Sequence, residues 1–263
     1  MSVLEGKTAV VTGASSGLGA DFTRILVEHG CNVVLVARRA DRLEQLQRQV
    51  SAMGSVQTHV IAMDLSAPGA AQVLYDRTRE LGLNADVLIN NAGFGIHGNF
   101  LDIPWEREHE MLELDIVALV HLTKLFVKDM VARNFGYVML VSSIGAYQPS
   151  PTYASYSAAK SFVLYFGEAL SYELRRTNVK VSVLSPGVTA TEFLQVAGQK
   201  PTLYQRLLMM PSERVARIGI DAMLKGKPSK VAGVLNAVPV QLMRLTPRRT
   251  AAAVAEVMMR YGA

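Results

Sequence analysis

Short apolar runs alternate along this chain with longer segments in which apolar residues recur at helical spacing. The runs are rich in Val, Ile and Leu, which is typical of parallel strands buried on both faces. They lie at residues 7–11, 32–36, 56–63, 86–89, 136–141 and 179–184. Between the first two runs, Leu18, Phe22 and Leu26 recur at helical spacing before Gly30, which predicts a helix that ends there. The alternation predicts an α/β fold with a doubly wound parallel sheet of about seven strands, in the order 3-2-1-4-5-6-7, and helices on both faces.

The middle of the chain contains two long helical patterns, at Trp105–Asn134 and Tyr153–Arg176. Each is apolar around much of its circumference, so we expect both to pair with a second copy in a homodimer or homotetramer. The rhythm then loosens over residues 189–211, where we predict a lid over the substrate. A helix at Ser212–Leu224 and a strand-like run at Lys230–Val234 follow. No linker interrupts the pattern, which predicts one domain over residues 1–263.

Composition narrows the class of protein. Among 263 residues, 27 Lys and Arg face 22 Asp and Glu, which gives a net charge of +5. The basic residues are scattered among acidic ones, so nucleic acid is not an expected partner. Cys31 is the one cysteine, and the N-terminus has no basic region followed by an apolar segment, so we expect a cytoplasmic protein without disulfides. The uncharged stretch Val231–Met243 is too short to span a membrane.

A glycine-rich turn connects the first predicted strand to the first predicted helix. Its glycines let the backbone approach a pyrophosphate at the N-terminus of the helix. The residues of the turn are Gly13, Ser15, Ser16, Gly17, Leu18 and Gly19. The same letters match the G-x-S-x-G elbow of serine hydrolases, but that motif requires earlier strands and a later histidine, and no histidine follows His121. The turn therefore predicts dinucleotide binding.

Two arginines, Arg38 and Arg39, follow the second predicted strand about 20 residues beyond the turn. An enzyme that uses NAD places an acidic side chain there, on the ribose 2′-hydroxyl. Guanidinium groups instead suit a 2′-phosphate, so we predict NADP(H) in preference to NAD(H). The alternative is that both arginines are the solvated start of the next helix.

Tyr156 and Lys160 are four residues apart in the second long helical pattern, and therefore share one face of that helix. The ordinary pKa of a phenol is about 10, and a neighbouring ammonium is expected to lower the pKa of Tyr156. Ser143 follows the fifth apolar run and can donate a hydrogen bond to a substrate carbonyl. These three residues predict acid–base chemistry at a carbonyl or alcohol.

Together these motifs resemble the short-chain dehydrogenase/reductase family, in its compact single-domain branch. The resemblance implies a Rossmann fold and a nicotinamide-dependent oxidoreductase in which Tyr156 transfers the proton, Lys160 also holds the nicotinamide ribose and Ser143 orients the carbonyl. It also implies cofactor contacts from residues after the third, fourth and sixth strands. These residues are Asp64, Leu65, Asn91, Ala92, Gly93, Pro186, Gly187, Val188 and Thr189.

One position departs from the family pattern, which usually has asparagine where this chain has Asp115. The resemblance implies that this residue is the fourth catalytic group and supports a helix kink whose backbone carbonyl holds a water of the proton relay. An ionised aspartate would also raise the pKa of Tyr156. An incidental substitution is the alternative.

The resemblance also indicates where the substrate would lie. The expected lining is Phe94, Ile96, His97, Ile144, Tyr147, Tyr153 and the segment 193–210. Most of these residues are apolar, which favours an apolar or amphipathic carbonyl compound, although they could instead pack the last helices onto the core. Residues 231–263 could pack on their own domain, dock on a partner or touch a membrane surface. No metal-ligand spacing such as H-E-x-x-H occurs.

The sequence thus predicts an NADP(H)-dependent oxidoreductase that interconverts a ketone or aldehyde with an alcohol. The alternative is a non-catalytic NADP(H)-binding regulatory or scaffold protein, which would need the glycine turn but not Ser143, Tyr156 and Lys160.

Overall fold

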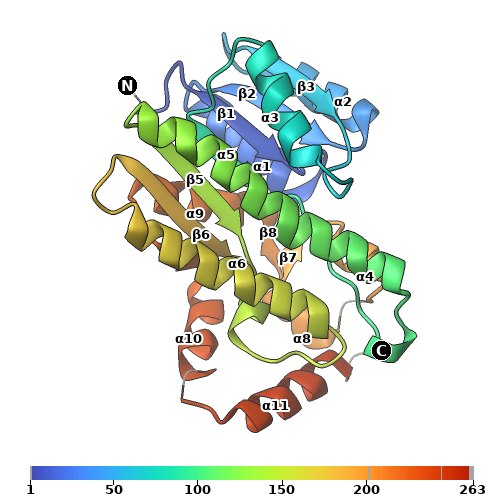
Figure 1. Ribbon diagram of the computed structural model, residues 1–263. Coiled ribbons are helices and arrows are strands. Elements are labelled where there is room, and N and C mark those ends of the chain that lie inside the picture. The colour runs from blue at the N-terminus through green and yellow to red at the C-terminus, as the bar shows by residue number, and fades with distance from the viewer. Residues whose placement is uncertain (1, 201, 244, 261–263) are drawn as a thin grey trace.

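A parallel sheet of seven strands runs through the centre of the molecule, in the order β3-β2-β1-β4-β5-β6-β9 (Figure 1). The computed structural model describes residues 2–200, 202–243 and 245–260, and the sheet lies within them. Each neighbouring pair of its strands is parallel, so the predicted sheet and strand order are confirmed. The strands are β1 Thr8–Thr12, β2 Asn32–Ala37, β3 Thr58–Ala62, β4 Val87–Asn90, β5 Gly136–Val141, β6 Val179–Ser185 and β9 Ser229–Val231.

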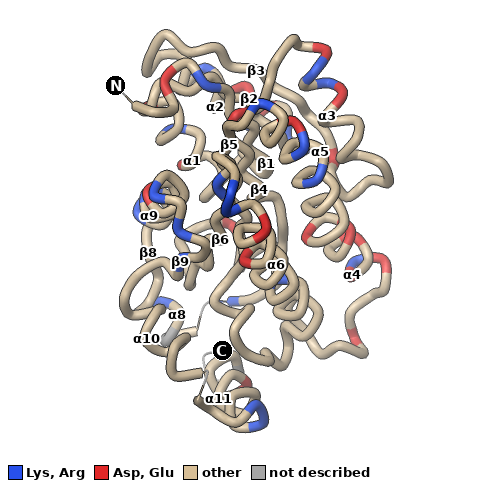
Figure 2. Tube along the Cα trace, turned by 60° about the vertical axis from the view of Figure 1, so that its left-hand side comes forward, with Lys and Arg blue, Asp and Glu red and all other residues tan. Residues whose placement is uncertain are grey.

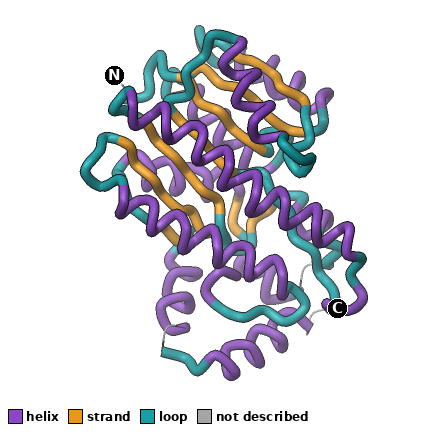
Figure 3. Tube along the Cα trace, viewed as in Figure 1, coloured by secondary structure: helices purple, strands orange, loops and turns teal. Residues whose placement is uncertain are grey.

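Helices cover both faces of the sheet (Figure 3). Side chains alternate between the faces along each strand, so Val11 packs in one apolar layer and Val10 in the other. The Val11 layer includes side chains of α1 Gly17–Glu28, α2 Ala40–Ser51 and α9 Ser212–Leu224. The Val10 layer includes side chains of α3 Ala70–Glu80, α5 Leu119–Ala132 and α6 Ala154–Glu173. Burial on both faces explains why the strands are continuous apolar runs.

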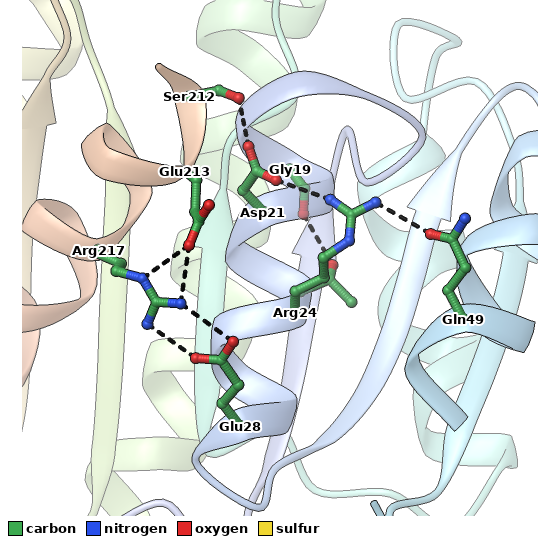
Figure 4. A network of polar contacts seen from close by, with 9 residues as sticks. Gly19, Asp21, Arg24, Glu28, Gln49, Ser212, Glu213 and Arg217 are labelled. Atoms are coloured by element: carbon green, nitrogen blue, oxygen red, sulfur yellow. Dashed lines mark hydrogen bonds and ion pairs between the residues drawn. The ribbon is translucent and has the colours of Figure 1, made fainter. Parts of the chain in front are cut away.

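Polar side chains join α9 to α1 on the first of these faces (Figure 4). The Ser212 hydroxyl donates to Asp21, which also accepts from Arg24 at 2.8 Å. Further along both helices, Arg217 donates both terminal nitrogens to Glu28, at 2.9 and 3.2 Å. Because α1 follows the glycine turn, these contacts hold the start of α9 beside the predicted nucleotide site.

The predicted helix over Trp105–Asn134 is interrupted in the structure. It consists of α4 Trp105–Leu112, one segment of π-helical hydrogen bonding at Glu113–Ala118, and α5. A short 3₁₀ helix at Phe100–Asp102 precedes it. Such π-helical turns occur frequently at functional sites, and this one contains Asp115.

Residues 189–211, predicted as a loose lid, contain regular elements. β7 Thr189–Ala190 pairs in parallel with β8 Met210–Pro211. Two short helices, α7 Phe193–Val196 and α8 Leu203–Leu208, lie between these strands. The pairing brings the two ends of the segment together, so the part between them forms a closed loop.

The C-terminal part differs from the prediction. The strand expected at Lys230–Val234 is confined to β9, and two helices that the sequence pattern did not identify follow, α10 Val234–Met243 and α11 Arg248–Arg260 (Figure 1). Their inner faces pack on the body, whereas Leu245 between them is 85% exposed. Figure 2 shows α10 without charged residues. Within the residues described, no helix is both long and apolar enough to cross a membrane.

Candidate active site

The glycine turn lies between β1 and α1, at the carboxyl edge of the sheet. Gly17 has a φ of +51°, a left-handed conformation that favours glycine. A Cβ on Gly19 would lie 2.1 Å from the carbonyl oxygen of Gly13, so only glycine fits there. The Ser16 side chain makes no capping hydrogen bond to α1, which leaves the first backbone N–H groups of this helix for an anion.

Two side chains hold this turn against the end of β4. The Thr12 hydroxyl donates to the Ile89 carbonyl at 3.2 Å and accepts from the backbone N–H groups of Asn91 and Ala92, each at 3.0 Å. The Asn91 amide nitrogen donates back to the Thr12 carbonyl at 2.9 Å. The ends of β1 and β4 are thereby fixed as one surface.

Both predicted 2′-phosphate residues contact acidic side chains. Arg38 lies 3.0 Å from a carboxylate oxygen of Glu110 and 3.7 Å from one of Asp64. Arg39 lies 3.0 Å from a carboxylate oxygen of Glu192 and donates to the hydroxyls of Ser15 and Ser16, at 3.2 and 2.9 Å. The Arg39 guanidinium is therefore linked to the glycine turn, and a phosphate arriving there would compete with Glu192.

Ser143, Tyr156 and Lys160 come together from two neighbouring elements. Ser143 follows β5 and caps the 3₁₀ helix Ile144–Tyr147, where its hydroxyl accepts from the Gly145 N–H at 3.1 Å. Tyr156 lies in the first turn of α6, and the Lys160 ammonium one turn later is 5.7 Å from the centre of its ring. The helical spacing of these two residues is thus confirmed.

Asp115 forms a buried ion pair with Lys160. One carboxylate oxygen lies 2.9 Å from Lys160 Nζ, and the two side chains are 0% and 6% exposed. The other oxygen accepts from the Phe94 N–H at 3.2 Å, and Lys160 also donates to the Val141 carbonyl at 3.2 Å. Burial raises the pKa of Asp115, while the Lys160 ammonium opposes that rise by stabilising the carboxylate. The π-helical turn is what brings Asp115 to this position.

The expected lowering of the Tyr156 pKa is wrong for this structure. Burial of the phenol and, second, the nearby charge of Asp115 raise the pKa of Tyr156, against a smaller lowering by a hydrogen bond with Ser143. Burial of the phenol is the larger cause, and the Asp115 carboxylate adds to it by offsetting the positive charge that Lys160 would otherwise present to the phenol. Both effects favour the protonated phenol of Tyr156 over the phenolate.

One cavity of about 450 Å³ joins the glycine turn to the three predicted catalytic side chains. Of the predicted residues, Gly19 and the fully buried Asp115 are absent from its walls, as are Ile96, His97 and Tyr147 from the predicted substrate region. The predicted residues that do line it are Gly13, Ser15, Ser16, Gly17, Leu18, Arg38, Arg39, Asp64, Leu65, Asn91, Ala92, Gly93, Phe94, Ser143, Ile144, Tyr153, Tyr156, Lys160, Pro186, Gly187, Val188, Thr189, Phe193 and Leu194.

Other lining residues were predicted only as part of a segment, or not at all. Glu192 contacts Arg39 from the start of the predicted lid, and Val196, Gln199 and Gln205 belong to the expected lining segment 193–210. Met259 on α11 was not identified from the sequence, because no local pattern marks it and it reaches the cavity only through the folding of the chain after β9. Among the described residues, no three His, Cys, Asp or Glu side chains gather closely enough to hold a metal ion.

A doubly wound parallel sheet with a glycine-rich first turn at its carboxyl edge defines a Rossmann-type protein. A model of the short chain dehydrogenase family matches residues 7–202. The chain belongs to this family of oxidoreductases, whose members bind a nicotinamide cofactor.

Known proteins of this family resemble the chain in sequence and in structure. Very-long-chain 3-oxoacyl-CoA reductase from Homo sapiens is 33% identical over 205 residues. The match covers 75% of this chain and 64% of that relative's length. A solved 7β-hydroxysteroid dehydrogenase structure is 26% identical, with a TM-score of 0.87 over 96% of this chain and 97% of its own. A short-chain dehydrogenase from Sphingobium yanoikuyae in complex with NADPH is 25% identical, with a TM-score of 0.80 over 94% of this chain and 98% of its own.

Replacing Gly19 with alanine should weaken binding of the nicotinamide cofactor at least about tenfold, because the new methyl group would collide with the Gly13 carbonyl and open the turn. Calorimetric titration with NADPH measures this change. Gly54→Ala is the control, because a Cβ at Gly54 meets nothing within 4 Å. Unchanged binding in a folded Gly19→Ala variant would contradict the role given to the turn.

Proposed function

We propose that this protein is an NADP(H)-dependent oxidoreductase that interconverts a ketone or aldehyde with an alcohol. The observation that carries the proposal is that Ser143, Tyr156 and Lys160 line the same cavity as the glycine turn. Membership in the short chain dehydrogenase family supports it. A regulatory or scaffold protein would not require these three side chains in one cavity.

The cavity walls suit a phosphorylated dinucleotide. The glycine turn offers close backbone approach and free N–H groups to the pyrophosphate, and Arg38 and Arg39 would hold the 2′-phosphate. The NADPH complex of the Sphingobium yanoikuyae relative supports this preference. When bound, the nicotinamide would exchange a hydride with the carbonyl carbon.

The protein side chains supply the proton and the orientation. The Ser143 hydroxyl would donate a hydrogen bond to the substrate oxygen, and the Tyr156 hydroxyl would give that oxygen its proton during reduction. The raised pKa of Tyr156 keeps the phenol protonated, which is the form that can give a proton to the substrate oxygen. Asp115 acts as a positioning residue, because it touches Lys160 and lies outside the cavity wall.

The substrate we propose is apolar or amphipathic. Phe94, Ile144, Phe193 and Leu194 contribute apolar wall beside the catalytic tyrosine, and the Phe193 ring centre lies 5.4 Å from that of Tyr156. The loop between β7 and β8 would act as the lid. The resemblance to an oxoacyl-CoA reductase and a hydroxysteroid dehydrogenase supports a carbonyl on a largely apolar body.

We also propose a homodimer or homotetramer built on the long helices. Val117 beside α5, and Phe162 and Tyr165 on α6, are exposed apolar or aromatic side chains that a second copy could cover. The single-domain organisation and the cytoplasmic location stay predictions.

Tyr156→Phe should abolish reduction of carbonyl substrates, by about a thousandfold or more, and leave the affinity for NADPH within about twofold, because the variant loses only the proton donor. NADPH oxidation against a panel of ketones and aldehydes measures turnover, and calorimetry measures binding. Tyr172→Phe, at an exposed position of the same helix, is the matched control. Tight NADPH binding without turnover in the parent protein on any carbonyl would favour the regulatory alternative.

Arg39→Ala should weaken NADPH binding about tenfold or more and leave NADH binding unchanged, because only NADPH carries the 2′-phosphate. Arg48→Ala, at an exposed position of α2, is the control for net charge. Equal losses for the two cofactors would contradict the role of Arg39.

Asp115→Asn should lower the pKa of Tyr156 by about one unit or more, because it removes a buried negative charge and retains an oxygen for Lys160. Reduction needs the protonated phenol, so the rate of reduction in the variant should start to fall at a lower pH than in the parent protein. Alcohol oxidation needs the phenolate, so the rate of oxidation should start to rise at a lower pH. Profiles of kcat/KM against pH in both directions measure the shift, with activity at neutral pH within a few-fold of the parent. Asp76→Asn, at an exposed site on α3, is the control. An unmoved alkaline limb would count against the charge effect.

A further inference from the structure

A polar cluster lies at the far wall of the cavity, beyond the catalytic tyrosine. Gln199 and Gln205, from the loop between β7 and β8, are 7% and 3% exposed and line the cavity together with Tyr153. The Tyr153 ring centre lies 5.8 Å from that of Tyr156, so the cluster adjoins the site where the carbonyl would react. Buried amides within an otherwise largely apolar wall require hydrogen-bond partners.

Hydrogen bonds fix which way each amide points. Gln199 Oε1 accepts from the Tyr153 hydroxyl at 2.7 Å and from Gln205 Nε2 at 3.2 Å. Gln205 Oε1 accepts from the Thr202 N–H at 2.9 Å, within the capping box that begins α8. With both amide oxygens engaged in this way, the two amide nitrogens are the groups left to make further contacts.

These amide nitrogens share a weak acceptor. The Met259 sulfur, from α11, lies 3.9 Å from Gln199 Nε2 and 3.7 Å from Gln205 Nε2. A thioether accepts hydrogen bonds poorly, so Gln199 Nε2 is under-satisfied, and Gln205 Nε2, which also donates to Gln199 Oε1, keeps a second N–H for a better acceptor. Met259 also lines the cavity, and its unbranched side chain can adopt other rotamers at little cost. An oxygen atom that displaced this sulfur would be a better partner for both donors.

The surroundings select the charge of that oxygen. The neighbouring walls come from Tyr153, Leu194, Val196 and Met259, and the cavity-lining cations, Arg38, Arg39 and Lys160, belong to the predicted nucleotide site and the ion pair. A carboxylate buried beside neutral amides alone would lose its hydration without a countercharge. A neutral acceptor, such as an ester, keto or hydroxyl oxygen, fits two amide donors.

We propose that Gln199 and Gln205 form a subsite for a neutral oxygen acceptor on the part of the substrate remote from the reacting carbonyl, and that Met259 occupies this subsite until substrate displaces it. The inference rests on the proposed function and narrows its substrate class. The substrates are then bifunctional: a reacting carbonyl, an apolar spacer and a second neutral oxygen.

Matched ketones test this proposal. Medium-chain methyl ketones of graded length are compared in two forms that differ at the chain end remote from the carbonyl, which is either a methyl group or a methyl ester. The quantity measured is kcat/KM, from NADPH oxidation. At the length that reaches the subsite, the keto ester should be preferred about tenfold, as expected for one or two neutral hydrogen bonds. In Gln199→Leu and in Gln205→Leu this preference should fall below about twofold. Gln195→Leu, exposed on α7 and outside this cavity wall, should retain it.

The ratio between the two ketones separates recognition from a purely structural role. If Gln199 only supported the loop, Gln199→Leu would lower kcat/KM for both ketones equally and leave their ratio unchanged, which would overturn the proposal. Met259→Leu removes the sulfur and keeps both amides, so the ester preference should be retained or increased. Equal rates for the two ketones at every length, in active parent enzyme, would also overturn it.

A binding measurement keeps this test independent of turnover. If NADPH binds but no ketone is reduced, the proposed reductase activity fails, and the subsite is tested by thermal stabilisation of the NADPH-bound protein. The keto ester should then raise the melting temperature more than the alkyl ketone in the parent protein and not in Gln199→Leu. Equal stabilisation by the two ketones would refute the subsite itself.

Discussion

The buried ion pair between Asp115 and Lys160 is the interaction on which the geometry of the site depends. It connects the π-helical turn before α5 to α6, while the Phe94 N–H and the Val141 carbonyl connect it to the chain after β4 and to the end of β5. Removing one member of such a pair costs about 3–5 kcal/mol, because the other charge is left buried and unpaired. The pair therefore ties four segments together at the carboxyl edge of the sheet.

The same pair contributes to the electrostatics of Tyr156, the proposed proton donor. An ammonium next to a phenol lowers the pKa of the phenol, but an ammonium already neutralised by a carboxylate does so far less. Burial and the charge of Asp115 accordingly raise the pKa of Tyr156. Where the family pattern has asparagine, the Asp115 carboxylate of this chain thus adds to the effect of burial in raising the pKa of Tyr156.

The two ends of the cavity show different solutions to the burial of polar groups. At the nucleotide end, Arg38 and Arg39 are partly exposed and paired with acidic side chains, so a phosphate can exchange with those partners in contact with water. At the substrate end, the amides of Gln199 and Gln205 are buried and satisfied mainly by each other and by Tyr153. Apart from the ion pair of Lys160 with Asp115, the charged side chains of the cavity wall thus lie at its partly exposed end, and neutral amides line the other end.

The sequence by itself determined the features that depend on neighbouring residues: the apolar strands, the glycine turn, the paired arginines and the helical spacing of Tyr156 and Lys160. Each follows from backbone periodicity or local sterics, which act over a few residues. The strand order was predicted from the alternation of strands and helices, because right-handed crossovers leave few ways to arrange parallel strands in one sheet. Only the tertiary structure decided that Asp115 meets Lys160, that acidic side chains engage the arginines, and that Met259 reaches the two glutamines. The α10 helix also escaped prediction, because it has no charged residue to mark a polar face and reveal its period. Contacts between residues far apart in the chain arise from how helices and loops pack over the sheet, and no local pattern specifies that packing.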